Sequence, residues 1–282
     1  MGLRVTAPVR IDISAGWPDS DPYRRDYGGA VLNAAINQRV SAHFDGNLTI
    51  SPDKVQSHSG QGTSGALRSV ELVASNPGLL KDRIGLIKKV HFLENRIVGH
   101  RAGFQDEAAA IYGGVNYWEF SSRGAIRRTP ILKRKAGHLQ ERVVLIYTGE
   151  SHLSGNIHEL VFGGRNYERN TQRFDRMKAI ASEMRDSIDD EDKMALLIAE
   201  TWELQKGLHT SIETPQMRAL QRYLAGTYLA ARAIGAGGGG SMLFYTSDRK
   251  SLVKMFSARK TLKKMEIIPF RFEYRGIKVS KR

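Results

Sequence analysis

Residues 102–120, AGFQDEAAAIYGGVNYWEF, combine residue types that can bind or transform a ligand. Gln105, Asp106 and Glu107 precede a run of alanines, and a pair of glycines follows. Acidic residues at the start of an apolar helix can simply stabilise its N-terminus. Carboxylates beside small side chains can also form a site, because the alanines leave room for a ligand. The residues of this segment alone leave both interpretations open.

A glycine-rich loop, SHSGQGTSGALRS at 57–69, runs into the start of a predicted helix. Successive backbone N–H groups in such a loop can hold an anion, and the helix N-terminus adds partial positive charge. The hydroxyls of Thr63 and Ser64 suit phosphate oxygens or a magnesium ion. The loop is neither a Walker motif, since no Gly-Lys-Ser/Thr follows, nor the Gly-x-Ser-x-Gly turn of hydrolases. A plain turn is the alternative to a phosphate site.

Two further segments have the composition of close turns. In 7–36 a strand delivers Arg10 and Asp12 to a glycine turn that contains Asp19, and a turn with solvated acids is the alternative interpretation. In 232–245, RAIGAGGGGSMLFY, four consecutive glycines run directly into an apolar strand. The absence of polar spacers favours a packed loop over a flexible linker.

Composition narrows the class of protein. The 282 residues include no cysteine, which excludes disulfides, thiolate zinc sites and cysteine nucleophiles. The eight histidines lack metal-site spacing, and no apolar segment reaches the ~18 residues of a membrane span. The first residues lack the layout of a secretion signal, so we expect a soluble, cytoplasmic protein.

The net charge of +14 is concentrated near the C-terminus. Residues 249–282 hold twelve Lys or Arg and two acids, which gives 12 − 2 = +10. Aromatic residues do not interleave with this basic run as they do in single-strand binders. We therefore favour a solvated face over a nucleic-acid groove, which stays a third hypothesis for the function of the protein.

Helical and extended patterns alternate along the chain and predict an α+β protein of two lobes. Strands are expected at 3–14, 142–149, 241–248 and in EIIPFRFEY (266–274). Helices are expected at 81–98, ending near Gly99, and at 104–112, 193–208 and 249–264. Another amphipathic helix is indicated by Phe174, Met177, Ala181, Met184 and Ile188, which recur at steps of three and four. The polar run 135–141 predicts the boundary between the lobes.

Taken in order, these segments resemble the GHMP kinases, and within them the D-glycero-D-manno-heptose 7-phosphate kinases and fucokinase-like sugar kinases. RIDISAGWPDSDPYRRDYGGAVLNAAI is similar to their opening motif, and GQGTSGA stands where they have a G-L-G-S-S-S-A phosphate loop. GFQDEAAAIYGG is similar to their G-K-Q-D-Q-Y-A-A-A-x-G-G segment, and GAGGGGSMLFY continues the agreement. The resemblance implies a ribosomal protein S5 domain 2-like, ATP-binding N-lobe at 1–140 and a ferredoxin-like C-lobe at 141–282.

The resemblance also implies catalytic and metal-binding roles. Asp106 matches the aspartate that accepts or orients the proton of the substrate hydroxyl, and Arg10 matches a basic residue near the transferred group. Ser64 and Glu94 match the hydroxyl and the helix glutamate that bind magnesium. These residues would serve phosphoryl transfer from ATP, with Mg²⁺ bridging phosphate oxygens.

Binding roles follow in the same way. Asp19 matches a carboxylate that accepts hydrogen bonds from sugar hydroxyls, and Gly237 and Gly238 belong to the third motif, at the substrate side of the phosphate loop. The positions that match the phosphate loop are Gly60, Gly62, Thr63, Ser64 and Gly65.

Departures from the family pattern keep two functions open. Gln61, Thr63 and Gly65 replace a leucine and two serines, the chain before the loop is shorter than in relatives, and Arg232 stands where lysine is common. The first hypothesis is an ATP- and Mg²⁺-dependent kinase that phosphorylates a hydroxyl, expected to be anomeric, of a heptose 7-phosphate or similar sugar. The second is a catalytically weak relative that binds nucleotide or another anion without turnover.

Overall fold

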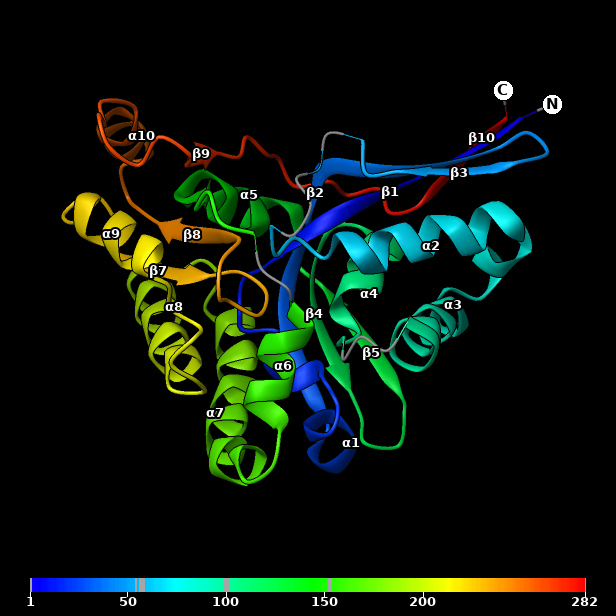
Figure 1. The fold of residues 1–282 in the computed structure, drawn as a ribbon, viewed down its shortest axis with the longest axis horizontal. Helices are drawn as coiled ribbons and strands as arrows, with labels where there is room; N and C mark the ends of the chain where they lie inside the picture. Colours follow the sequence, from blue (N-terminus) through cyan, green and yellow to red (C-terminus); the bar gives the residue numbers. More distant parts are fainter. Residues whose placement is uncertain (1, 54, 56–58, 99–101, 152–153, 282) are drawn as a thin grey trace.

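Two long strands, β1 (Leu3–Asp12) and β2 (Gly29–Phe44), form the centre of the first of two antiparallel sheets (Figure 1). The computed structural model describes residues 2–281 except 54, 56–58, 99–101 and 152–153. The strand order is β10-β1-β2-β4-β5, with β3 also paired to β2. The other members are β3 (Leu48–Ser51), β4 (Val115–Phe120), β5 (Ile126–Pro130) and β10 (Lys278–Lys281). A shift in register between Pro8 and Val9 precedes the segment of β1 that carries Arg10.

The second sheet has the order β7-β8-β6-β9. Its strands are β6 (Val143–Tyr147), β7 (Ala230–Ala233), β8 (Ser241–Tyr245) and β9 (Glu266–Ile267). Every residue of β6, β7 and β8 is buried, which explains why their sequences lack polar–apolar alternation, and the one charged residue among them, Arg232, is buried as well.

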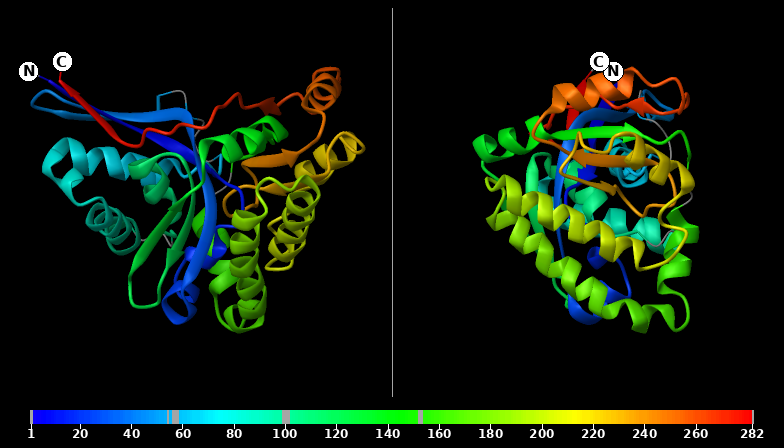
Figure 2. Two further views of the ribbon diagram at one scale, coloured as in Figure 1. Left: turned by 180° about the vertical axis from the view of Figure 1, so that it is seen from behind. Right: turned by 90° about the vertical axis from the view of Figure 1, so that its left-hand side faces the viewer.

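Helices cover both sheets. On the first sheet lie α2 (Thr63–Ser75) and α4 (Gln105–Tyr112). Against these helices pack η2 (Pro77–Lys81), α3 (Arg83–Phe92) and the π-helix η3 (Leu93–Val98). The turn after β1 holds η1 (Trp17–Asp19) and α1 (Tyr23–Tyr27). The other helices are α5 (Lys133–Arg142), α6 (Ser154–Phe162), α7 (Asn166–Asp186), α8 (Glu191–Lys206), α9 (Pro215–Tyr223) and α10 (Arg249–Ser257). In Figures 1 and 2, α7 lies on the opposite side of β2 from α2 and α4, so both lobes contribute to one core.

Several sequence expectations are confirmed. The apolar residues at steps of three and four are all buried, four of them in α7 and Ile188 just after it, and α4 occupies the expected segment. The predicted helix at 81–98 is a ten-residue α-helix continued by η3, while its expected end at Gly99 lies outside the described residues. Gly237, Gly239 and Gly240 are buried, so the glycine-rich segment is a packed loop.

Two expectations about elements need correction. The basic helix is shorter than 249–264, because α10 ends at Ser257. The predicted strand at 266–274 keeps only the two residues of β9, since Pro269 has no N–H to donate to a ladder. The polar run 135–141, which predicts the boundary between the lobes, lies within α5. The chain then returns to the first sheet, where β10 pairs with β1, and the boundary at 140/141 stays a prediction.

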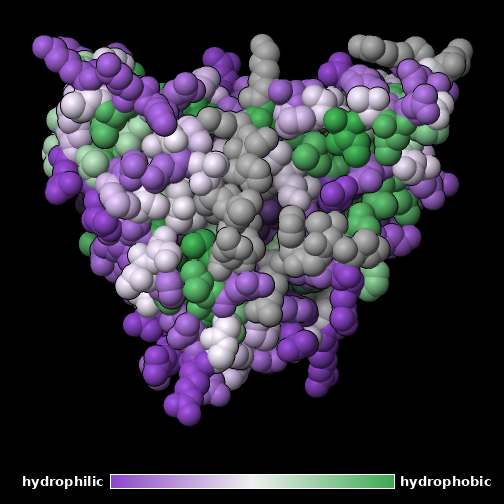
Figure 3. Space-filling view, viewed as in Figure 1, coloured by the Kyte–Doolittle hydropathy of each residue, from purple (hydrophilic) through white to green (hydrophobic). Residues whose placement is uncertain are grey.

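The surface on the face of Figure 3 is mostly hydrophilic, with smaller hydrophobic groups between. No helix in the described part of the chain is long and apolar enough to cross a membrane.

Candidate active site

Arg10 and Asp106 form a direct contact between β1 and the first turn of α4. Arg10 Nε donates to Asp106 Oδ1 over 2.8 Å, and Arg10 Nη2 lies 2.6 Å from the same oxygen. The arginine side chain is 5% exposed and the aspartate side chain 17%. Burial alone would lower the pKa of Arg10, but neighbouring carboxylates, Asp106 first, raise it above its ordinary value. Both contacts end on Oδ1, which leaves Asp106 Oδ2 as the oxygen that can face a ligand.

The glycine loop wraps around this pair. The backbone N–H of Arg10 donates to the carbonyl of Gln61 over 3.0 Å, and Arg10 Nη1 donates to the carbonyl of Gly60. Gly60 and Gly62 have φ of +81° and +69°, a conformation that favours glycine. A Cβ on Gly62 would lie 2.8 Å from Asp106 Cγ, and one on Gly65 would lie 2.8 Å from Asp106 Cβ. The loop therefore needs glycine to approach α4 this closely.

The N-terminus of α2 points its backbone donors toward this junction without a side-chain cap. Its N-cap residue is Gly62, which makes no side-chain hydrogen bond, and the first helical N–H bond starts at Ala66. Thr63 Oγ1 is buried and has no hydrogen-bond partner among the described residues. The first N–H groups and this hydroxyl are donors that an anion can satisfy.

Two buried carboxyl groups, those of Glu94 and Glu107, lie beside the loop. The hydroxyl of Ser64, at the start of α2, donates to Glu94 Oε1 in η3. Burial first, and then Glu107, raise the pKa of Glu94 to about 8. Burial, and then Asp106, raise the pKa of Glu107 well above its ordinary value. Glu107 lies 3.4 Å from His91 Nδ1, and its carboxyl oxygens have no hydrogen-bond partner among the described residues.

Asp19 lies at the end of η1, on the other side of α4. Its Oδ2 accepts the backbone N–H of Gln105 over 2.7 Å, so Asp19 satisfies a donor of the α4 N-terminus. A Cβ on Gly103 would lie 2.0 Å from Asp19 Oδ1, so only glycine fits there. Burial, with a further contribution from Asp106 and Glu107, raises the pKa of Asp19 to about 8.

The third motif meets the phosphate loop through a glycine other than the two that were predicted. A Cβ on Gly235 would lie 3.0 Å from the carbonyl oxygen of Gly60. Gly237 instead faces Ile212, and Gly238 faces Ile157. The motif thus lies beside the phosphate loop as expected, while the role of Gly237 and Gly238 at a substrate stays a prediction.

The structure brings the predicted residues of four separate segments together. Arg10, Asp106 and the glycines of the loop are in contact, Ser64 meets Glu94, and Asp19 meets the start of α4. Sequence reasoning assigned no role to Glu107, although its place in an alanine run was a visible signal. It also assigned none to Asp12 and Arg232, which form a fully buried ion pair of 3.0 Å.

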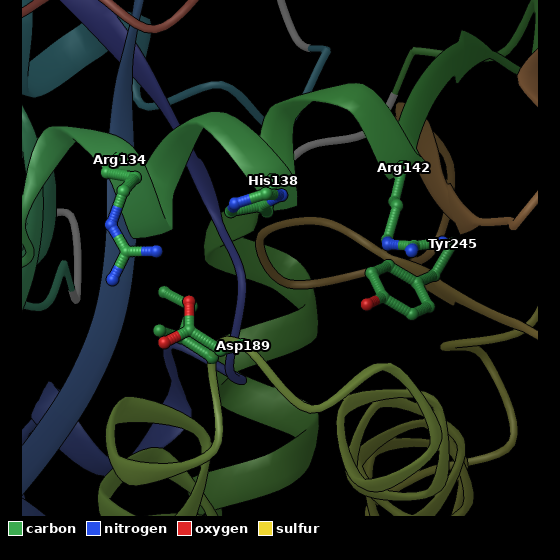
Figure 4. A pocket seen from close by; sticks show the side chains of 6 residues that line it. Arg134, His138, Arg142, Asp189 and Tyr245 are labelled. Carbon is green, nitrogen blue, oxygen red and sulfur yellow. The ribbon is translucent and has the colours of Figure 1, made fainter.

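A separate surface hollow of about 190 Å³ lies between α5, β8 and the turn before α8. Figure 4 shows Arg134, His138 and Arg142 of α5 above Asp189, with Tyr245 at one side. Lys135 Nζ already lies 2.6 Å from Asp189, and Arg142 already lies 2.5 Å from Glu191. None of the residues predicted for the active site lines this hollow, and protein partners neutralise two of its charges.

No known family profile matches the chain. It is 23% identical to the D-glycero-alpha-D-manno-heptose 7-phosphate kinase of Campylobacter jejuni, over an alignment of 337 residues that covers 98% of each protein. Since 337 exceeds the 282 residues of this chain, the relative has segments that this chain lacks.

Solved structures agree in the overall fold. A D-glycero-D-manno-heptose 1-phosphate kinase from Bacteroides thetaiotaomicron superposes with a TM-score of 0.76 at 18% identity, over 99% of each chain. The mevalonate kinase of Methanococcus jannaschii superposes with a TM-score of 0.68 at 16% identity, over 96% of this chain and 98% of that one. The resemblance to the GHMP kinases is confirmed, and the chain has their two-lobed α+β fold.

Proposed function

We propose that this protein is an ATP- and Mg²⁺-dependent kinase that phosphorylates a hydroxyl, expected to be anomeric, of a heptose 7-phosphate or a similar sugar. The observation that carries the proposal is the contact of Arg10 with Asp106 beside the uncapped N-terminus of α2. An anion site and a carboxylate that can receive a hydroxyl proton lie side by side, as phosphoryl transfer requires. The names of similar proteins, which are sugar and mevalonate kinases, support the same class of reaction.

The residues of the loop fit the phosphates of ATP. The first N–H groups of α2, the hydroxyl of Thr63 and the backbone at Gly60, Gly62 and Gly65 present donors where an anion gains from the helix dipole. Arg10 adds a cation next to them. Its guanidinium would stabilise the charge that builds up on the transferred phosphoryl group.

Ser64 and Glu94 offer oxygen ligands for a divalent cation, and no group of three His, Asp or Glu side chains among the described residues is placed to hold a metal ion by itself. Hard cations such as Mg²⁺ prefer oxygen ligands, and Ser64 and Glu94 already place a hydroxyl and a carboxyl against each other. Nearby Glu107 is buried without a hydrogen-bond partner among the described residues, and it would become negatively charged when a bound cation displaced its proton. Ser64 and Glu94 would hold the ion, which when bound would neutralise charge on the phosphate oxygens.

Asp106 would activate the hydroxyl of the acceptor sugar, and Asp19 would bind the sugar. Arg10 fixes Oδ1 of Asp106, so Oδ2 would orient the acceptor hydroxyl and receive its proton as the oxygen attacks phosphorus. Asp19 would accept hydrogen bonds from other hydroxyls of the sugar, beside the third motif with Gly237 and Gly238. The reaction uses ATP, so we propose a cytoplasmic location, and it needs no nucleic-acid partner.

The test is ADP release with ATP, Mg²⁺ and a panel of sugar phosphates. For the preferred sugar, Asp106→Asn should lower kcat by about 10²- to 10⁴-fold, together with a lower thermal midpoint because Arg10 loses its nearest carboxylate. Asp192→Asn, at an exposed residue of α8, is the matched control and should keep the parental rate. A parental rate in Asp106→Asn would remove the assigned role. Nucleotide binding without turnover of any sugar would instead support the second hypothesis from the sequence.

A further inference from the structure

A buried ion pair joins the two lobes directly behind the candidate active site. Asp12 is the last residue of β1, and Arg232 lies in β7 of the second sheet. Arg232 Nη2 lies 3.0 Å from Asp12 Oδ2, and both side chains are 0% exposed. Arg232 Nη1 also donates to the backbone carbonyl of Asp12 over 2.6 Å, and Nη2 donates to Gln205 Oε1 over 3.3 Å. The guanidinium therefore fixes both the backbone and the side chain of Asp12.

Asp12 has two further partners, and both belong to the site. Its Oδ1 lies 3.6 Å from Arg10 Nη1. The backbone N–H of Gly235 donates to Asp12 Oδ1 over 2.9 Å, with Oδ2 at 3.2 Å. Burial alone would raise the pKa of Asp12, but Arg232 and Arg10 bring it below its ordinary value. The carboxylate is thus held as an anion between two guanidinium groups and an amide.

These partners are the ones that place the reacting groups. Arg10 holds Asp106 and donates to the carbonyl of Gly60, and Gly235 approaches the same carbonyl. A displacement of Asp12 would therefore reach both sides of the phosphate loop at once. Because β1 and β7 belong to different sheets, the ion pair also fixes the position of the second lobe relative to the loop.

We propose that Asp12 and Arg232 are a positioning pair, in which Asp12 orients Arg10 and Gly235 and Arg232 holds Asp12 across the lobe junction. The pair touches no reacting atom, and its effect passes through Arg10 to Asp106 and through Gly235 to the phosphate loop. This inference rests on the proposed function for its kinetic consequence, but the geometry that it predicts can be observed without turnover.

The test separates positioning from simple stabilisation. Asp12→Asn leaves Arg232 buried without its anion, so a loss of thermal stability is expected whatever the role of the pair. The double variant Asp12→Asn with Arg232→Gln removes both charges and should recover the thermal midpoint. If the pair positions Arg10, kcat of the double variant stays about 10²-fold below the parent with a smaller change in KM for ATP, because a small misplacement of a reacting group is costly. A parental kcat in the recovered double variant would overturn the proposal.

Two further measurements test the positioning role of the pair even if a variant folds poorly or the proposed function is wrong. Arg232→Lys keeps the cation that Asp12 needs and should retain most of kcat, and a loss equal to that of Asp12→Asn would contradict the pairing. A crystal structure of the double variant should show Arg10 displaced from Asp106. An unchanged Arg10–Asp106 contact there would refute positioning even if the parent phosphorylates no sugar, whereas a displaced Arg10 in an inactive parent would refute only the kinase.

Discussion

Asp12 and Glu107 are both completely buried, yet the pKa of Asp12 is lowered and that of Glu107 is raised. Asp12 lies between Arg10 and Arg232 and accepts the N–H of Gly235. Glu107 instead has His91 at 3.4 Å, and burial lowers the pKa of that imidazole, which favours its neutral form. Two carboxyl groups with equal burial thus differ in whether the fold supplies a cation.

The presence or absence of a neighbouring cation distinguishes a buried carboxyl group with a structural role from those proposed to bind ligands. A buried carboxylate that is paired with cations of the chain needs no ligand for charge balance, and its interactions hold the neighbouring residues in place. Buried acids that lack a cation destabilise the fold unless they are protonated or a ligand brings positive charge. Asp19, Glu94 and Glu107 belong to this second class, and they surround the start of α4 where ATP, magnesium and sugar are proposed to bind.

The largest effect on activity is expected from a change that forces the glycine loop and α4 apart, next to the buried acids that lack a cation. In Gly62→Ala the new Cβ would lie 2.8 Å from Asp106 Cγ, so the phosphate loop or α4 must move. We expect kcat/KM to fall by about 10²-fold, since a shift of about 1 Å at reacting groups has effects of this size. The measurement is steady-state ADP release.

The control for Gly62→Ala places alanine at another glycine with positive φ, where the new Cβ makes no close contact. Gly226 has φ of +81°, and a Cβ at this position would have no neighbouring atom within 4 Å. Gly226→Ala should lower the free energy of unfolding by about 1 kcal/mol and leave kcat/KM unchanged. Equal kinetics in the two variants would show that the approach of the loop to Asp106 has no catalytic role.

A smaller effect, on stability, should follow from replacing Glu107 by glutamine, the residue that the family segment has at this position. The raised pKa means that the folded protein binds a proton that the unfolded chain releases above its ordinary pKa of 4.5. The contribution of Glu107 to the free energy of unfolding therefore falls as pH rises from about 5 to 8. Glu107→Gln does not titrate, so it should exceed the parent by about 1–2 kcal/mol at pH 8 and by little at pH 5.

Chemical unfolding at the two pH values measures this difference. Glu168→Gln, at an exposed residue of α7, is the matched control and should follow the parent at both. A Glu107→Gln variant that is less stable than the parent at pH 8 would mean that the carboxylate has a cationic partner after all. The comparison with Asp12 would then lose its basis.

How far the sequence predicts these regions depends on how local their signals are. Arg10, Ser64 and Asp106 each lie in a motif whose order and composition can be recognised, and the structure places all three around the phosphate loop. The glycines at 60 and 62 could be predicted because a positive φ needs glycine wherever the loop folds. Local patterns of this kind persist in the sequence.

The ion pair of Asp12 with Arg232 has no such signal. The two residues are 220 positions apart, and they meet only because β7 is carried to the end of β1 by the packing of both sheets. The burial of Glu107 has only the alanines that follow it as a signal, since the first turn of a helix normally exposes its acids to solvent. The segment after β9 shows the same limit, because the alternation of Phe270 and Phe272 predicts that both are buried but not that Phe272 forms a bridge to Ile36 of β2.

The smallest expected effect is on the stabilisation of the protein by Mg²⁺. It tests directly whether a buried acid that lacks a cation from the chain binds one. Burial and Glu107 raise the pKa of Glu94 to about 8, so at pH 6 this ligand carries a proton that a cation must displace. Mg²⁺ at ten times its Kd should raise the free energy of unfolding by about 1.4 kcal/mol at pH 8 and by less at pH 6. Glu94→Gln should abolish this response. In Glu107→Gln the pKa of Glu94 should fall but stay raised by burial, so the response to Mg²⁺ at pH 6 should be larger than that of the parent. Thermal shift titrations with Mg²⁺ at the two pH values distinguish these cases, and an equal response of the parent at both would show that Glu94 is ionised without any cation nearby.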